Sequence, residues 1–219
     1  MENSVWDMTL AKFLEDTASH APTPGGGSVA MVSASLGLGL VIMALEISLK
    51  SLKSLKKKPS LSDLGAIEDL LKTARQQMQL LTLQVEQDIT VFKRYMEAIS
   101  LPKQTPAEKI HRQQAIQVAI LAATSVPLAA ARDTLAAIET AMVAAQISQT
   151  QVISDVGAGS ALLGGAIAGV LLNVDINLPH ISDPEIKQKF ALEKEELANR
   201  SQEKVRMILA QVQQRIAKN

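Results

Sequence analysis

The sequence predicts an all-α fold, a single-domain bundle of about six long helices with Ala/Gly-rich central helices. Three observations favour this class. No segment alternates apolar and polar residues as a strand on a sheet surface does. Aromatic residues make up only 2% of the chain, whereas the helix formers Ala, Leu, Gln and Lys are abundant. No linker-like stretch interrupts the 219 residues, so residues 1–219 are expected to form one domain.

The first two predicted helices flank a glycine-rich turn. Thr9 can cap a short helix that ends near Ser19, before the proline at Pro24. A much longer apolar helix is expected to begin after Gly27 and to stop by Pro59.

Two more long helices are predicted in the middle of the chain. Residues 60–63 resemble a capping signature, and apolar positions then keep a helical period up to Leu101. Residues 105–108 offer Thr as N-cap, Pro at the first helical position and Glu at the third. That helix should run to about Gln146, with a kink at Pro127.

The last two predicted helices differ in composition. One is charge-free, begins near Ser154 and ends before Leu178, while the other begins at Asp183 and has the mixed charge of a solvated surface. Ten of the eleven glycines fall in residues 25–39 and 157–169. Because small residues let backbones approach, the second and fifth helices are expected to pack on each other or on copies in a partner subunit.

Composition limits the classes of function. Lys+Arg and Asp+Glu both total 22, so no net charge favours a nucleic-acid partner. The absence of cysteine excludes disulfide and thiolate chemistry, and it fits a cytoplasmic protein, as does an N-terminus without a basic secretory region. His20, His111 and His180 lack paired metal-ligand spacing and are expected in surface or loop positions, so no metal site is predicted.

Two charge-free stretches, residues 17–45 and 156–174, are long enough to suggest membrane spans. Serines interrupt the first stretch, neither has a Trp or Tyr belt, and both are rich in Gly and Ala. A soluble bundle or a subunit interface is therefore preferred, with a small membrane protein as the alternative.

Residues 23–28 form the clearest candidate ligand site. The glycines allow positive φ and a close approach of ligand to backbone, and the following helix start offers unpaired N–H groups. Such a turn could hold an anion or a polar ligand, or could be a turn without a ligand. It lacks the Lys-Ser/Thr of a P-loop, which excludes that nucleotide motif.

A few polar residues stand in otherwise apolar helices. Asp88 lies among apolar neighbours, and Asp155 opens the fifth helix. Asn173 and Asn177 are four positions apart and would share a helix face, where two amides can fix the edges of a heterocycle. Solvation of Asp88 and simple capping by the other three residues remain the alternatives.

One basic cluster follows the second helix, and its members are Lys50, Lys53, Lys56, Lys57 and Lys58. It could be a solvated helix end or a docking strip for an anionic tail.

Taken in order, these segments resemble the cyclodeaminase/cyclohydrolase family of folate enzymes. The matching segments are residues 23–28, 85–92, 98–103, 125–128, 154–156 and 172–178. The resemblance extends from about Thr9 to Arg206 and implies an all-helical homodimer that acts on tetrahydrofolate one-carbon adducts. It implies formiminotetrahydrofolate cyclodeaminase activity, with methenyltetrahydrofolate cyclohydrolase activity or a catalytically silent folate-binding protein as alternatives.

The resemblance also implies residue roles. Asp88 would be the general acid/base, with its pKa raised by apolar surroundings. The implied folate-binding residues are Pro24, Gly25, Gly26, Gly27, Ser28, Asp155, Asn173 and Asn177. Lys50 and Lys53 would meet the glutamate tail, although the paired basic residues common in the family are spaced out here. Neither a metal nor a redox cofactor is required by this chemistry.

Overall fold

The computed structural model describes residues 4–54 and 61–218, and all regular secondary structure within these ranges is helical. This confirms the all-α class. The elements in chain order are η1 (Val5–Asp7), α1 (Leu10–Thr17), α2 (Gly26–Ser54), α3 (Leu61–Ser100), α4 (Pro106–Ile147), η2 (Thr150–Val152), α5 (Ile153–Asn177), η3 (Leu178–His180) and α6 (Pro184–Ala217).

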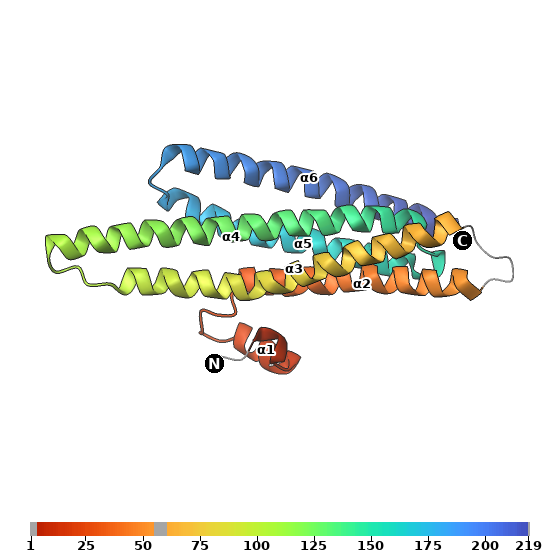
Figure 1. Ribbon diagram of the computed structural model, residues 1–219, viewed down its shortest axis with the longest axis horizontal. Helices are drawn as coiled ribbons and strands as arrows, with labels where there is room; N and C mark the ends of the chain where they lie inside the picture. The colour runs from red at the N-terminus through yellow and green to blue at the C-terminus, as the bar shows by residue number, and fades with distance from the viewer. Residues whose placement is uncertain (1–3, 55–60, 219) are drawn as a thin grey trace.

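Four helices form the body of an elongated bundle (Figure 1). α2 packs against α3 and α5, and α4 packs against the same two helices from the other side. α6 lies along α4 and α5, while α1 stands apart from the bundle near the start of α2. The fully buried side chains inside the bundle include Met31, Leu38, Leu81, Leu128, Ile138 and Leu163.

Most predicted helix starts are confirmed by their capping bonds. The Thr9 hydroxyl accepts from the Lys12 N–H at 3.1 Å. Thr105 and Glu108 form the reciprocal capping box that their spacing predicts. The Asp183 carboxylate accepts from the N–H groups at the start of α6. Ser60, in the signature predicted for α3, lies outside the described residues.

The glycine segment differs from the prediction in one respect. α2 begins at Gly26, so Gly26 and Gly27 form its first turn and Ser28 lies inside the helix instead of at its boundary. The Val29 N–H donates to the Gly25 carbonyl at 3.0 Å. No glycine in the described ranges has a positive φ. Gly25, Gly26 and Gly27 therefore do not form a left-handed turn, and the chain enters the helix directly.

α2 and α5 approach each other at two glycines, as the glycine distribution predicts. A Cβ atom added to Gly37 would lie 2.7 Å from the Gly159 carbonyl oxygen and 3.0 Å from Leu162 Cβ. Nothing larger than glycine fits between these backbones without moving them.

Three helical segments are long and apolar enough to cross a membrane by length and composition, and they are Gly26–Ser54, Pro106–Ile147 and Thr150–His180. In the most apolar window of Gly26–Ser54, 56% is buried inside the protein. Packing within the bundle thus covers a little over half of this apolar window, and Leu36, Met43 and Ile47 of α2 stay exposed.

Candidate active site

A cavity of ≈ 410 Å³ lies where α2 begins, between the four helices of the bundle. The first turn of α2 lines it on one side, and side chains of α3, α4 and α5 line the others. The cavity is therefore enclosed by segments that are far apart in the sequence.

Asp88 of α3 is the acidic side chain of this cavity. The Ser28 hydroxyl, fully buried, donates to Asp88 Oδ2 at 2.8 Å. Burial raises the pKa of the Asp88 carboxyl, and the hydroxyl and backbone N–H of Ser28 offset only part of that rise. Asp88 is thus a carboxyl group that holds a proton more readily than usual at a fixed position in the cavity.

The backbone of Gly27 lies directly against that carboxyl group. A Cβ atom on Gly27 would lie 2.6 Å from Asp88 Cγ, and nearer still to Asp88 Oδ1 and to Asn173 Nδ2. The start of α2 can therefore sit against both polar side chains only because residue 27 has no side chain. Close approach, and not backbone conformation, is the reason for glycine here.

The Asn177 side chain donates to a carbonyl of α4 that has no donor within its own helix. Pro127 has no N–H, so the carbonyl four residues earlier, at Ala123, loses its normal helical donor. Asn177 Nδ2 donates to that carbonyl at 2.8 Å. This bond links α5 to α4 at the wall of the cavity and leaves the amide oxygen of Asn177 without a partner in the described part of the chain.

Of two aromatic side chains in this cavity, the sequence analysis included Phe92 within the segment that resembles the family and did not identify Tyr95. Phe92 and Tyr95 line the cavity, four and seven positions after Asp88 on the same face of α3. This helical spacing is the signal that could have identified Tyr95. His180, expected in a surface or loop position, lies in η3 and also lines the cavity.

Glu86 faces away from Asp88, as their separation of two positions predicts, and it holds the N-terminal segment. Its carboxylate accepts from the Ser4 hydroxyl at 2.6 Å and from the Val5 N–H at 2.9 Å. The Trp6 indole N–H donates to the Thr82 carbonyl at 3.0 Å. These bonds anchor the chain before α1, and the cavity wall at residues 22–25 comes shortly after α1.

The structure does not bring Lys50, Lys53 and Asp155 of the same chain to this cavity. Lys50 lies roughly 36 Å beyond Gly26 along α2 at the usual helical rise. Lys53 pairs with Glu68 at 2.7 Å, and Asp155 stands in the first turn of α5, at the opposite end from Asn173. The lysines at positions 56, 57 and 58 lie outside the described residues.

In the described ranges, no group of three or more His, Cys, Asp or Glu side chains could hold a metal ion. The chemistry that this cavity offers is proton transfer by Asp88 and polar binding by the asparagines.

Comparison with known proteins identifies the family of the chain. The family model for formiminotransferase-cyclodeaminase matches residues 9–196. A methenyltetrahydrofolate cyclohydrolase of Methylorubrum extorquens is 33% identical over 80% of this chain and 81% of its own length. A formimidoyltransferase-cyclodeaminase of Gallus gallus is 29% identical over 95% of this chain, which spans only 37% of that protein.

The fold is also found in a solved structure. The crystal structure of a formiminotetrahydrofolate cyclodeaminase from Thermotoga maritima superposes with a TM-score of 0.78, covering 98% of each chain at 22% identity. With the family match over most of the chain and the cyclohydrolase relative above 30% identity, the protein belongs to the formiminotransferase-cyclodeaminase family.

Proposed function

We propose that this protein is a folate-dependent cyclodeaminase that closes 5-formiminotetrahydrofolate to 5,10-methenyltetrahydrofolate and releases ammonia. One observation carries the proposal: Asp88, whose pKa is raised by burial, is fixed by Ser28 inside a cavity at the N-terminal end of α2. Family membership supplies the folate substrate class.

The reaction needs protons moved between nitrogens. N10 of the folate attacks the formimino carbon bound to N5 and gives up its proton, which forms a tetrahedral carbon between the two nitrogens. The former imino nitrogen takes up protons and leaves as ammonia, and the N5–C–N10 unit becomes the methenyl cation. A carboxyl group with a raised pKa suits both proton transfers, because its carboxylate is a stronger base toward the N10 proton and can then pass a proton to the leaving nitrogen.

The other residues of the cavity fit a heterocyclic substrate. A volume of ≈ 410 Å³ lies within the usual range for small-molecule sites, about 300–1,000 Å³. Phe92 and Tyr95 offer aromatic faces for stacking, and Asn173 and Asn177 offer amide groups for the pterin edge. We propose that Pro24 and Gly25 to Ser28 bind from the side of α2, and that no metal or redox cofactor takes part.

A second candidate is methenyltetrahydrofolate cyclohydrolase activity. It is favoured by the 33% identity to the Methylorubrum protein of that name, which this chain covers for 81% of its length. In that reaction water adds to the methenyl carbon and loses a proton. The C–N5 bond of the resulting adduct then breaks, N5 receives a proton, and the hydroxyl loses its proton to leave a formyl group on N10. Asp88 could serve as the same proton carrier, so the site accommodates either reaction.

The deciding experiment offers the purified protein 5-formimino- and 5,10-methenyltetrahydrofolate separately and follows methenyl absorbance. Methenyl formed from the first substrate identifies a cyclodeaminase, whereas loss of methenyl above the uncatalysed rate identifies a cyclohydrolase. If the protein binds folate but shows neither activity, both enzyme proposals are wrong and the protein is a catalytically silent folate-binding protein.

We also propose that the protein works as a homodimer in the cytoplasm. The lack of cysteine suits a reducing compartment. The case for the homodimer rests on exposed apolar side chains of α2 and α5, among them Leu36, Leu172 and Ile176, which are 59%, 65% and 70% exposed.

A further inference from the structure

Both reactions that this site accommodates exchange one proton with solution in each turnover. In the ring closure, the imino nitrogen of the neutral formimino group gains two protons before it leaves as ammonia. N10 supplies one of them and solution supplies the other. In the hydrolysis, water brings two protons, of which N5 keeps one and solution receives the other. A route for one proton between the bound folate and solvent is therefore needed in either reaction.

Asp88 by itself is poorly placed to provide that route. Its carboxyl group is half-buried, and its Oδ2 atom accepts from the fully buried Ser28 hydroxyl at 2.8 Å. A folate bound in the cavity displaces the water around this group, because a small-molecule site encloses most of its ligand. The proton therefore needs a second carrier that touches both the cavity and solvent.

His180 meets both conditions. Asp88, Tyr95 and His180 are the titratable residues among the described ones that line the cavity. Tyr95 carries a phenol, which ordinarily keeps its proton near neutral pH. His180 is exposed to solvent, and within the described part of the chain no hydrogen bond engages its ring. An imidazole can accept a proton on one nitrogen and donate from the other, which suits it to shuttling protons.

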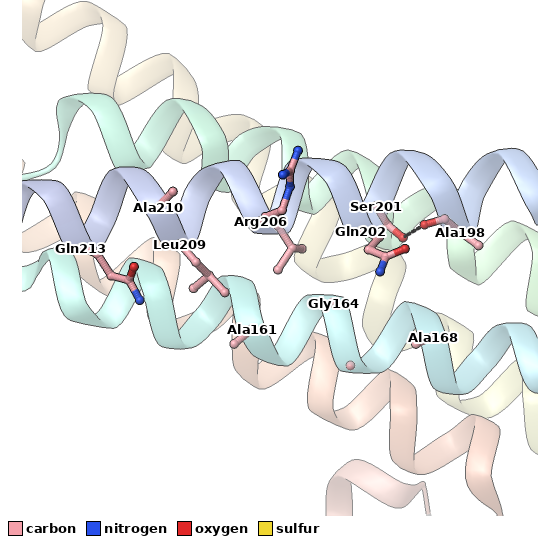
Figure 2. Close-up of a pocket in the computed structure, with 12 residues that line it drawn as sticks. Ala161, Gly164, Ala168, Ala198, Ser201, Gln202, Arg206, Leu209, Ala210 and Gln213 are labelled. Carbon is pink, nitrogen blue, oxygen red and sulfur yellow. Dashed lines mark hydrogen bonds between the residues drawn. The ribbon is translucent and has the colours of Figure 1, made fainter.

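The larger groove between α5 and α6 has no comparable group. Its volume is ≈ 800 Å³, and Figure 2 shows Ala161 and Ala168 of α5 across from Leu209 of α6. Of the described residues that line it, Arg206 alone is titratable, and a guanidinium does not release its proton. The means for proton exchange are therefore found at the Asp88 cavity and not in this groove.

A side chain of α4 fixes the segment that carries His180. Gln117 Nε2 donates to the His180 carbonyl at 3.1 Å, and Gln117 Oε1 accepts from the Ser182 N–H at 3.0 Å. One amide group thus pairs with the backbone on both sides of Ile181, whose side chain is buried. The ring of Pro179 restricts the backbone just before His180. η3 is therefore held in place although two of its three residues are exposed.

Asn177 makes a matching contact in the opposite direction. Its amide donates from α5 to the Ala123 carbonyl of α4, whereas Gln117 donates from α4 to His180. Gln117 and Ala123 are six residues apart, or about 9 Å along α4. Because Asn177 and His180 both line the cavity, these two bonds set the position of its rim.

We propose that His180 is a second catalytic residue, which carries the exchanged proton between the bound folate and solvent, and that Gln117 is the residue that positions it. This role deepens the proposed function and rests on it. In the ring closure, Asp88 takes the N10 proton and passes it to the former imino nitrogen. The His180 imidazolium gives that nitrogen its other proton as the C–N bond breaks, and the neutral imidazole then takes a proton from solution. In the hydrolysis, His180 accepts one proton of the attacking water and releases it to solution, while the other reaches N5 by way of Asp88.

Replacement of His180 by glutamine tests the proton relay. His180→Gln keeps a polar side chain but cannot carry a proton, so kcat should fall about 10²-fold with KM within about twofold of the wild type. Imidazole added to the assay should restore most of that rate, because position 180 is open to solvent, and should leave the wild type unchanged. His111→Gln, at an exposed position of α4 outside the cavity lining, is the control and should keep the wild-type rate. A kcat within about threefold of the wild type, or a loss that imidazole does not restore, overturns the relay.

Gln117→Ala tests the positioning role. Without its two hydrogen bonds, kcat should fall about tenfold, and the Ser182 amide proton should exchange faster with solvent. In a His180→Gln background the same change should have no further effect on kcat, because the group that Gln117 positions is gone. Gln114→Ala, at an exposed position of the same helix, is the matched control. Equal losses of kcat in both backgrounds overturn the positioning role, since a general structural defect would add to the effect of His180→Gln.

The activity of the wild type separates this role from the proposed function. If the wild type turns over either folate and His180→Gln matches its rate, the relay is wrong and the proposed function stands. If the wild type turns over neither 5-formimino- nor 5,10-methenyltetrahydrofolate, the proposed function is wrong and the role of His180 is overturned with it.

Discussion

Glycine serves two different purposes at two places on α2. At Gly37 the missing side chain makes room for the backbone of α5, whose Gly159 does the same in return. At Gly27 the missing side chain makes room for the carboxyl group of Asp88 and the amide of Asn173. The first contact holds helices together and the second brings reactive groups together, so substitutions at the two sites should fail in different ways.

The contrast between Gly27 and Gly37 requires that Asp88, the neighbour of Gly27, transfers protons. Asp88→Asn tests this role, and it is the substitution with the largest expected effect. Asparagine keeps the shape and an acceptor for Ser28 but cannot transfer protons, so kcat should fall by about 10³-fold with folate binding retained. Steady-state rates together with a binding titration measure both quantities. Turnover within threefold of the wild type would remove Asp88 from the mechanism.

Gly37→Ala should be the most damaging change for stability. Its Cβ would meet backbone atoms, which cannot rotate away, so the free energy of unfolding should fall by about 3 kcal/mol. Denaturant titration gives the value. The matched control is Gly65→Ala in α3, where a Cβ meets nothing within 4 Å, and that variant should gain about 0.5–1 kcal/mol from helix propensity.

Gly27→Ala should lower activity more than stability, unlike Gly37→Ala. The atoms that its Cβ would meet belong to side chains, which can move aside, so most of the cost should appear as a displaced Asp88. We expect kcat to drop about 10²-fold with a smaller loss of stability than in Gly37→Ala. Gly26→Ala, whose Cβ meets nothing within 4 Å, is the stability control. If the alanine variants at positions 27 and 37 lose the same unfolding free energy, the two glycines do not differ in purpose as described here.

The hydrogen bond from Asn177 to the Ala123 carbonyl combines the two purposes, because it joins α5 to α4 and also forms part of the cavity wall. Asn177→Ala should cost about 1–2 kcal/mol in unfolding free energy, because a carbonyl at the cavity wall loses its donor. Adding Pro127→Ala restores an N–H within α4 and should recover part of that loss. A double variant less stable than Asn177→Ala alone would show that the carbonyl is not the cause.

The smallest expected effect is the pH dependence of stability that Asp88 contributes. Because the folded pKa of Asp88 lies above its ordinary value of 3.8, the protonated carboxyl stabilises the fold at low pH. That contribution is lost as pH rises through the raised pKa. The stability of Asp88→Asn relative to the wild type should therefore increase from pH 3 to neutrality, whereas Gly65→Ala should keep a constant offset. Calorimetric melting temperatures across this range provide the measurement.

The helices and their caps could be predicted from the sequence because they depend on neighbours within four residues, as at Thr9 and Thr105. Asp88, Gly27 and Asn173 were also identified, and the structure brings them together. The positions of Lys50 and Asp155 could not be deduced from motif order. Order along a chain does not say which ends of long antiparallel helices meet, and both residues lie a full helix length from the cavity.

The hydrogen bonds at Glu86 also give the protein a natural reporter. The Val5 amide proton is held by Glu86, on the helix that carries Asp88, and the chain from there leads through α1 to the cavity wall at Thr23. Its rate of exchange with solvent measures how often the N-terminal segment detaches. Ligand entering the cavity should slow that exchange, so a single backbone resonance would register occupancy without any label near the folate.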